Sequence, residues 1–189
     1  MEYIKRRIEG VVVVEPTIYG DDRGYLFESF RDKEFRERVC DTTFVQENQS
    51  RSSRGVVRGL HFQAPPYAQS KLVRVVKGRV LDVVVDIRKG SATYGEYESV
   101  ELSEENNRQI FIPRGFAHGF VVLEDAIFQY KCDNYYNHAS ERSILWNDSE
   151  LAIDWGIDHA MATLSDKDKL SPRFKDFDSP FSIDANYYE

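Results

Sequence analysis

The sequence contains little cysteine and no long apolar segment, and both absences limit the kind of protein it encodes. Its 189 residues include only Cys40 and Cys132, too few for a disulfide framework. No apolar run approaches the ~20 residues that a membrane-spanning helix needs. Residues 1–10 are charged and lack the apolar core of a secretory signal. We therefore expect a cytoplasmic protein that has no membrane partner.

Several common active-site signatures are also missing. The chain has no GxxxxGK[ST], GxGxxG or GxSxG motif, which argues against P-loop phosphoryl transfer, Rossmann cofactor binding and α/β-hydrolase chemistry. Its only histidines are His61, His118, His138 and His159, and they form no His-x-His pair and no close cluster with glutamate. Because a facial-triad metal centre needs such a cluster, we expect no metal site.

Acidic residues are absent from one stretch of an otherwise acidic chain. Residues 48–81 hold no aspartate or glutamate, whereas the whole chain has a net charge of −7. The basic residues of this strip are Arg51, Arg54, Arg58, Lys71, Arg74, Lys77 and Arg79. The acidic net charge disfavours nucleic acid and anionic membranes as partners, because both need a broadly basic face. The local strip instead predicts a site for an anionic ligand.

Short β-rich runs separated by turn signals cover most of the chain. We expect strands at 11–15, 25–30, 44–46, 56–63, 72–76, 80–87, 97–102, 109–112, 116–123 and 127–132. Gly, Pro, Asp and Asn predict the breaks between them, including one at 77–78. Many short strands at this spacing indicate an all-β barrel or sandwich, and a jelly roll suits their number.

Two regions outside the strands are expected to be helical or irregular. Asp32 can cap a short helix over residues 33–39. Residues 148–189 are polar and aromatic with little strand periodicity, so we expect a helix-and-coil extension packed on the barrel. With 189 residues, no internal repeat and no linker, the chain is most simply one domain.

Residues 54–63 (RGVVRGLHFQ) combine the apolar character of a strand with polar residues that a purely structural strand does not need. His61 is therefore a candidate general base, although a lone strand histidine is about as often a hydrogen-bonded core residue. In an ideal strand, Arg58 and His61 point to opposite faces. Both can serve one pocket only if the strand bulges, and Gly59 between them permits a bulge.

Five further residues are candidates for the site or its support. Lys71 begins a strand and could stabilise an oxyanion, or it could be a solvated strand end. His118, in residues 113–120 (PRGFAHGF), is expected to face the interior. Asp82 and Asp86 are possible partners for it, but both could be exposed, Asp86 more readily than Asp82. Tyr130 could be routine strand packing or a general acid.

Seven segments together resemble the dTDP-4-dehydrorhamnose 3,5-epimerase family. They are 21–24 (DDRG), 58–63 (RGLHFQ), 71–75 (KLVRV), 83–88 (VVVDIR), 113–120 (PRGFAHGF), 143–148 (SILWND) and 164–168 (LSDKD). They occur in the family's order across nearly the whole chain. The resemblance implies a cupin-type jelly roll that works as a homodimer without a metal or other cofactor. Residues 124–127 and 131–136 depart from the family's pattern, beside Tyr130.

The resemblance also implies a role for each matching residue. His61 would remove the protons at C3 and C5 of a 4-keto-6-deoxy sugar, and Asp168 would orient His61. Tyr130 would return a proton on the opposite face of the ring, and Lys71 would stabilise the enolate at the C4 oxygen. The implied nucleotide- and sugar-binding positions are Arg23, Glu28, Gln46, Asn48, Arg58, His118, Glu141 and Lys167.

The implied reaction converts dTDP-4-dehydro-6-deoxy-D-glucose into dTDP-4-dehydro-L-rhamnose, a step of dTDP-L-rhamnose biosynthesis. Three alternatives stay open. The chain could invert only C3 or only C5 of a related dTDP-4-keto-6-deoxy sugar. It could be a sugar-nucleotide-binding barrel without catalytic activity, or a metal-dependent cupin oxygenase.

Overall fold

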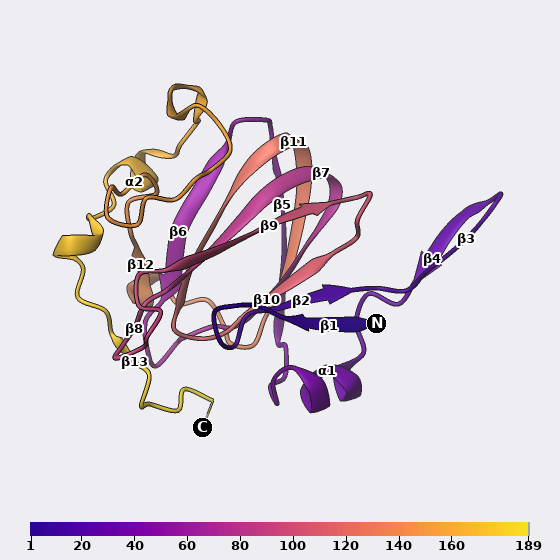
Figure 1. The fold of residues 1–189 in the computed structure, drawn as a ribbon, viewed down its shortest axis with the longest axis horizontal. Helices are drawn as coiled ribbons and strands as arrows, with labels where there is room; N and C mark the ends of the chain where they lie inside the picture. Colours follow the sequence, from indigo (N-terminus) through magenta and orange to yellow (C-terminus); the bar gives the residue numbers. More distant parts are fainter. Residues whose placement is uncertain (189) are drawn as a thin grey trace.

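A curled β-sheet dominates the computed structural model, which describes residues 1–188 (Figure 1). Its strands run in the order β1 (Glu2–Lys5), β2 (Val12–Glu15), β10 (Gln109–Ile112), β7 (Lys71–Asp86), β11 (Phe116–Cys132), β6 (Val57–Gln63) and β12 (Glu141–Ser143). Two more strands join it, β5 (Gln46–Ser52) on β11 and β9 (Tyr97–Ser103) on β7. All pairings within this sheet are antiparallel. The long strands β7 and β11 therefore form its centre.

Smaller elements surround this sheet. The hairpin of β3 (Ile18–Asp21) and β4 (Gly24–Phe27) projects from the body of the molecule, on the right of Figure 1. Helix α1 (Asp32–Arg38) lies below β1 and β2 in the same view. A short parallel pair joins β8 (Arg88–Lys89) to β13 (Phe181–Ser182). The remaining elements are three 3-10 helices and one short α-helix: η1 (His138–Ser140), η2 (His159–Met161), α2 (Asp166–Lys169) and η3 (Phe174–Asp176).

Where the central strands are covered on both faces, consecutive residues are apolar, as at residues 83–85 of β7. Val84 of β7 faces one apolar cluster with Phe120 and Phe128. Its neighbour Val83 faces another cluster, which includes Trp155 of the C-terminal extension. Complete burial of such side chains contributes ~1.5–3 kcal/mol each. The predicted helix-and-coil extension is thus present, and it packs on the outer face of the sheet.

The strand predictions hold for most positions, but two predicted breaks are wrong. Strands β7 and β11 run without interruption through residues 77–78 and 124–126. Their register shifts between Val122 and Phe128. Gly78 has a φ of +76°, and a Cβ there would lie 2.1 Å from the Asp125 carbonyl oxygen. A glycine bulge therefore bends the paired strands where the sequence suggested a turn.

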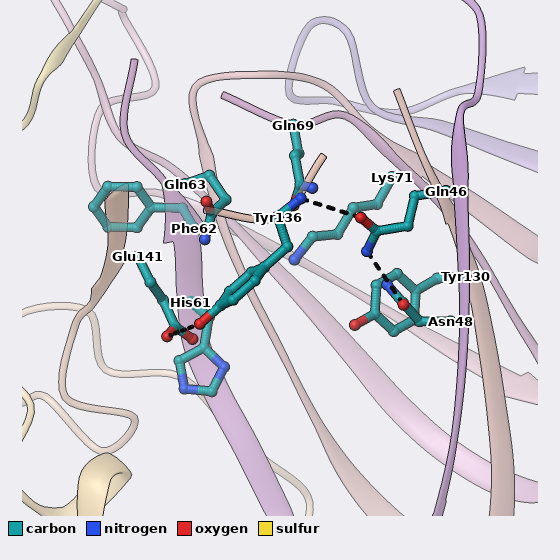
Figure 2. Close-up of a pocket in the computed structure, with 10 residues that line it drawn as sticks. All are labelled: Gln46, Asn48, His61, Phe62, Gln63, Gln69, Lys71, Tyr130, Tyr136 and Glu141. Carbon is teal, nitrogen blue, oxygen red and sulfur yellow. Dashed lines mark hydrogen bonds between the residues drawn. The ribbon is translucent and has the colours of Figure 1, made fainter. Parts of the chain in front are cut away.

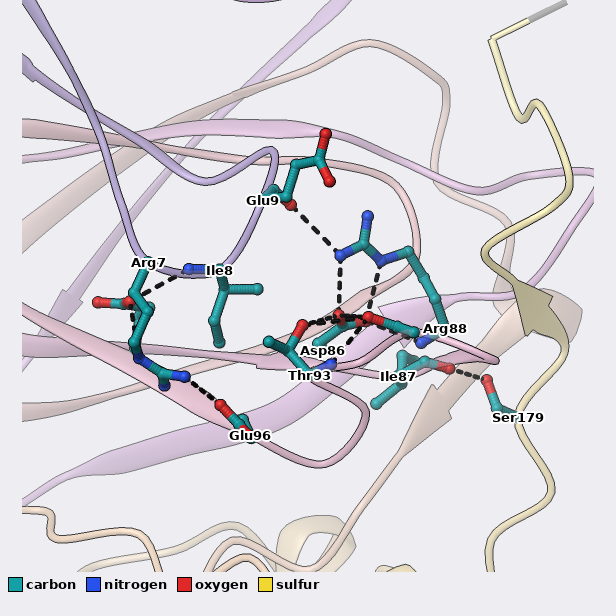
Figure 3. A network of polar contacts seen from close by, with 11 residues as sticks. Arg7, Ile8, Glu9, Asp86, Ile87, Arg88, Thr93, Glu96 and Ser179 are labelled. Atoms are coloured by element: carbon teal, nitrogen blue, oxygen red, sulfur yellow. Dashed lines mark hydrogen bonds and ion pairs between the residues drawn. The ribbon is translucent and has the colours of Figure 1, made fainter.

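The predicted positions of Asp32 and Asp86 also need correction. Arg31 occupies the N-cap of α1 without a side-chain cap bond, and Asp32 lies in the first turn. Asp86 is completely buried. Its carboxylate accepts hydrogen bonds from Arg88 Nε at 2.9 Å and from Thr93 Oγ1 at 2.7 Å (Figure 3). Burial alone would raise the Asp86 pKa, but these bonds hold it below its ordinary value, so the carboxylate anchors the turn after β7.

Candidate active site

A cavity of about 350 Å³ opens at one end of the barrel. Strands β5, β6, β7, β11 and β12 contribute to its wall, together with the segments before β7 and after β11. Its lining residues are Gln46, Asn48, His61, Phe62, Gln63, Gln69, Lys71, Tyr130, Tyr136 and Glu141 (Figure 2). The cavity therefore brings together three of the four predicted catalytic residues.

Asp168, the fourth predicted catalytic residue, is not part of the cavity lining but contacts His61, which is. Its Oδ1 lies 2.5 Å from His61 Nε2, and its side chain is only 4% exposed. Ser165 caps the short helix α2 by accepting a hydrogen bond from the Asp168 amide. Burial opposes ionisation of Asp168, but the bonds from His61 and Ser165 hold its pKa below the ordinary value. The structure thus joins two residues that are 107 positions apart.

The ionised carboxylate determines how the His61 ring can act. A carboxylate only accepts hydrogen bonds, so His61 Nε2 must carry the shared proton. His61 Nδ1 then keeps its lone pair and can accept a proton, as a general base requires. His61 is partly exposed, at 28%, and it lines the cavity.

The predicted irregularity around Gly59 is present. The register of β6 against β11 shifts between His118 and Phe120, and Gly59 has a φ of +139°. A Cβ at Gly59 would lie 2.5 Å from Gly119 Cα, so only glycine fits this crossing. Arg58 is exposed and donates to Ser52 Oγ at 3.1 Å. It does not line the 350 Å³ cavity, but its charge acts on Tyr130.

Lys71 and Tyr130 lie side by side on the wall formed by β7 and β11. Lys71 Nζ is 5.7 Å from the centre of the Tyr130 ring. Burial lowers the pKa of the Lys71 ammonium, and the charges of Asp82 and Glu141 oppose this only in part. Burial raises the pKa of the Tyr130 phenol, so the hydroxyl keeps its proton well above neutral pH.

His118 faces the interior, as predicted, and Asp82 is its partner. His118 Nε2 lies 2.9 Å from Asp82 Oδ2, and Asp82 is completely buried. Burial lowers the pKa of His118, which favours a neutral imidazole. His118 pairs with His61 across β11 and β6, so this buried pair lies next to the catalytic histidine candidate.

Polar residues at the mouth of the cavity form a chain of hydrogen bonds. Gln46 Nε2 donates to Asn48 Oδ1 at 3.2 Å, and the Tyr136 amide donates to Gln46 Oε1 at 3.1 Å. The Tyr136 hydroxyl donates to Glu141 at 2.9 Å, and Lys167 Nζ lies 2.5 Å from the same carboxylate. Sequence reasoning missed Tyr136 because it lies in residues 131–136, which depart from the family's pattern.

Arg23 and Glu28 do not join this site. Arg23 is 90% exposed at the tip of the β3–β4 hairpin and pairs with Asp21. Glu28 follows the hairpin and pairs with Arg31. Figure 1 places this hairpin away from the barrel.

The predicted basic strip is likewise not one anion site. Of its residues, only Lys71 lines the cavity. Arg79 lies within salt-bridge distance of Glu101 and Glu124, and the Arg74 guanidinium lies 5.5 Å from the Phe27 ring centre.

Within residues 1–188, no group of three or more His, Cys, Asp or Glu side chains is placed to hold a metal ion. Every helix in that range is too short or too polar to cross a membrane.

The sequence model of the family described as dTDP-4-dehydrorhamnose 3,5-epimerase matches residues 5–176. The chain belongs to this family. A relative of that name from Shigella flexneri is 51% identical over 180 residues, which cover 94% of this chain and 98% of the relative. The family resemblance drawn from the sequence is therefore confirmed.

Solved structures of the family agree with the fold. The dTDP-4-dehydrorhamnose 3,5-epimerase of Elizabethkingia anophelis NUHP1 superposes with a TM-score of 0.89 at 50% identity, over 93% of this chain and 97% of that one. An epimerase from Legionella pneumophila Philadelphia 1, in complex with dTDP-4-keto-L-rhamnose, gives a TM-score of 0.90 at 47% identity and 94% coverage of both chains. The predicted cupin-type jelly roll is confirmed.

A relative with a narrower reaction has the same fold. A 3'-monoepimerase from Streptomyces bikiniensis gives a TM-score of 0.84 at 36% identity, over 90% of this chain and 86% of that one. The fold alone therefore does not decide how many carbons are inverted.

Proposed function

We propose that this protein inverts C3 and C5 of dTDP-4-dehydro-6-deoxy-D-glucose to give dTDP-4-dehydro-L-rhamnose, as an isomerase of dTDP-L-rhamnose biosynthesis. Family membership supports the reaction class. The observation that carries the proposal is one cavity in which His61, held by Asp168, faces the wall of Lys71 and Tyr130 (Figure 2). A base, an acid and a cation for the oxyanion are the parts that this reaction needs.

The first step is removal of a proton beside the C4 ketone. His61 Nδ1 accepts the proton from C3 or C5, and the electron pair moves onto the C4 oxygen as an enolate. The Asp168 carboxylate stabilises the imidazolium that forms. The Lys71 ammonium stabilises the enolate oxygen, and its burial strengthens that interaction because water screens it less.

The second step returns a proton to the other face of the same carbon. Tyr130 suits this role because burial raises the pKa of its phenol, which therefore enters the reaction protonated. Figure 2 shows Tyr130 and His61 on different walls of the cavity. A base on one face and an acid on the other invert each carbon, and no redox cofactor or metal takes part.

The remaining polar residues hold the sugar nucleotide in place. Gln46, Asn48 and Glu141 line the cavity mouth, with Lys167 bonded to Glu141. His118 lies beneath the sugar, and Arg58 binds the diphosphate from outside the cavity. The guanidinium suits a phosphate because it offers several N–H donors in a fixed plane.

The protein works as a cytoplasmic homodimer built from one domain per chain. The projecting β3–β4 hairpin supports this proposal, because it exposes apolar side chains that need cover. Tyr19 is 68% exposed, Tyr25 60% and Leu26 74%. Docking of the hairpin on the other protomer would also bring Arg23 and Glu28 to a substrate. A Leu26→Asp variant that stays dimeric in sedimentation velocity would contradict this arrangement.

Incubation with dTDP-4-dehydro-6-deoxyglucose in heavy water tests the reaction. We expect deuterium from solvent at both C3 and C5 of the product, read by NMR. Label at only one carbon would favour the second candidate, a single-position epimerase. The departure of residues 131–136 from the family's pattern and the monoepimerase relative motivate that candidate. No label at either carbon would overturn both.

A further inference from the structure

A buried polar cluster lies directly behind the wall that carries Lys71. Ser70, completely buried, precedes Lys71 in the chain. Lys71 lines the cavity, whereas the Ser70 hydroxyl contacts Tyr188 outside it. The Ser70 amide donates to Asp133 Oδ1 at 2.6 Å, and the Ser70 carbonyl accepts from the Asp133 amide at 3.3 Å. Two backbone bonds of Ser70 thus depend on Asp133.

The Asp133 carboxylate is completely buried and connects further segments to this point. Its Oδ2 accepts from Thr42 Oγ1 at 2.9 Å and from Arg114 Nε at 3.1 Å. The next residue, Asn134, is bonded to Gln69: its carbonyl accepts a hydrogen bond from Gln69 Nε2 at 2.7 Å. Gln69 and Lys71 both line the active-site cavity, so the residues on either side of Ser70 belong to the site.

Tyr187 and Tyr188, in the C-terminal segment, contact Ser70 and Arg114 and complete this cluster. The Tyr188 hydroxyl lies 2.7 Å from Ser70 Oγ and accepts from the Arg114 amide at 3.1 Å. The hydroxyl therefore bonds both Ser70 and the backbone of Arg114. The Arg114 guanidinium lies 5.0 Å from the centre of the Tyr188 ring and also donates to the Tyr187 carbonyl. Burial of the hydroxyl raises the Tyr188 pKa, which keeps the phenol protonated.

We propose that Tyr188, Arg114 and Asp133 act as a latch that positions Lys71 for catalysis by holding Ser70 from the outer face. Tyr188 is a positioning residue in this scheme, since it acts through Ser70 and does not touch the cavity. Tyr188 as a whole residue is 37% exposed, so it adds little to the core, and its specific contribution is the bonding of its hydroxyl. The inference rests on the role proposed for Lys71.

Tyr188→Phe tests the latch because it removes only the hydroxyl. Tyr188→Phe removes two hydrogen bonds, one with Ser70 Oγ and one from the Arg114 amide. Loss of one such bond is worth about a fivefold change, and we expect kcat to fall by at least that amount with KM within twofold. The thermal midpoint should stay within a few degrees. Ser70→Ala should also lower kcat, and the double variant should lose no more than Tyr188→Phe alone, because Tyr188→Phe already removes the bond to Ser70.

Tyr94→Phe serves as the matched control, because Tyr94 packs on Phe174 away from the cavity; its kcat should equal that of the wild type. Equal kcat in Tyr188→Phe and the wild type would overturn the latch alone. A lowered thermal midpoint with unchanged kcat would also overturn it, since that result indicates a merely structural contact. A wild-type protein without turnover would overturn the proposed function, and the latch with it.

Discussion

Replacing Asp168 by asparagine is the sharpest single perturbation of the proposed base. The carboxylate holds His61 Nε2 at 2.5 Å and is 4% exposed. Asparagine keeps the shape and can still present an oxygen to the ring. It removes the charge that stabilises the imidazolium as His61 takes the substrate proton.

The size of the effect follows from the kind of hydrogen bond that is lost. A bond to a charged group contributes ~1.5–3 kcal/mol, against ~0.5–1.5 kcal/mol for a neutral one. Solvent screens this pair little, because the Asp168 side chain is almost completely buried. Asparagine keeps a neutral bond, so removal of the charge as the imidazolium develops should cost the difference, about 1–2 kcal/mol, which lowers kcat about 5- to 30-fold.

Steady-state turnover of dTDP-4-dehydro-6-deoxyglucose measures this loss. Asp166→Asn is the matched control, since Asp166 lies in the same short helix, is 97% exposed and pairs with Lys169. We expect the control to keep kcat within twofold of the wild type. If Asp168→Asn also stays within twofold, the carboxylate does not support His61, and the proposed dyad is refuted.

Two further predictions concern Lys71 and Gly59. The alkaline limb of the kcat/KM pH profile should fall at a pH below the ordinary lysine pKa, because burial lowers the Lys71 pKa and the neutral amine cannot stabilise the enolate. Lys71→Arg should move that limb to higher pH; an unmoved limb would exclude Lys71 as its source. Gly59→Ala should lower the free energy of unfolding by ~1–3 kcal/mol more than Gly24→Ala, measured by urea titration, because both residues have positive φ but only Gly59 is crowded, by Gly119. Equal losses would contradict this crowding argument.

Local sequence pattern was sufficient for much of the fold and part of the site. Short β-rich runs and the turn residues between them located the strands, because β-branched and aromatic residues suit a pleated, half-buried surface. The glycine between Arg58 and His61 predicted the irregularity that the register of β6 and β11 contains. The pairing of His61 with Asp168 could not be predicted from local pattern. Residues 107 positions apart have no local signal, and only the family resemblance suggested that pair.

Two of the errors share a physical origin, which is that local sequence does not report distant partners. Gly78 suggested a turn, but the matching irregularity around Asp125 makes it a bulge in two paired strands. Asp86 is a different case, because its partners are close in sequence. The pattern did not show that the Arg88 guanidinium and the Thr93 hydroxyl turn back onto its carboxylate.

The basic strip shows the same effect, because the fold separates its residues. Arg79 looked like part of an anion site, yet its charge is met by Glu101 and Glu124 from other strands. A run of like charges in sequence therefore predicts a ligand site only where the fold leaves those charges together.

Solvent exchange in a Tyr130→Phe variant tests the central claim, that His61 and Tyr130 act on opposite faces of the sugar. The variant keeps the base but lacks the acid, so His61 should remove a proton and return one from solvent to the same face. In heavy water we therefore predict deuterium in the recovered, uninverted substrate, with little product. A His61→Ala variant should show neither exchange nor inversion. Inversion at the wild-type rate in Tyr130→Phe would contradict the account.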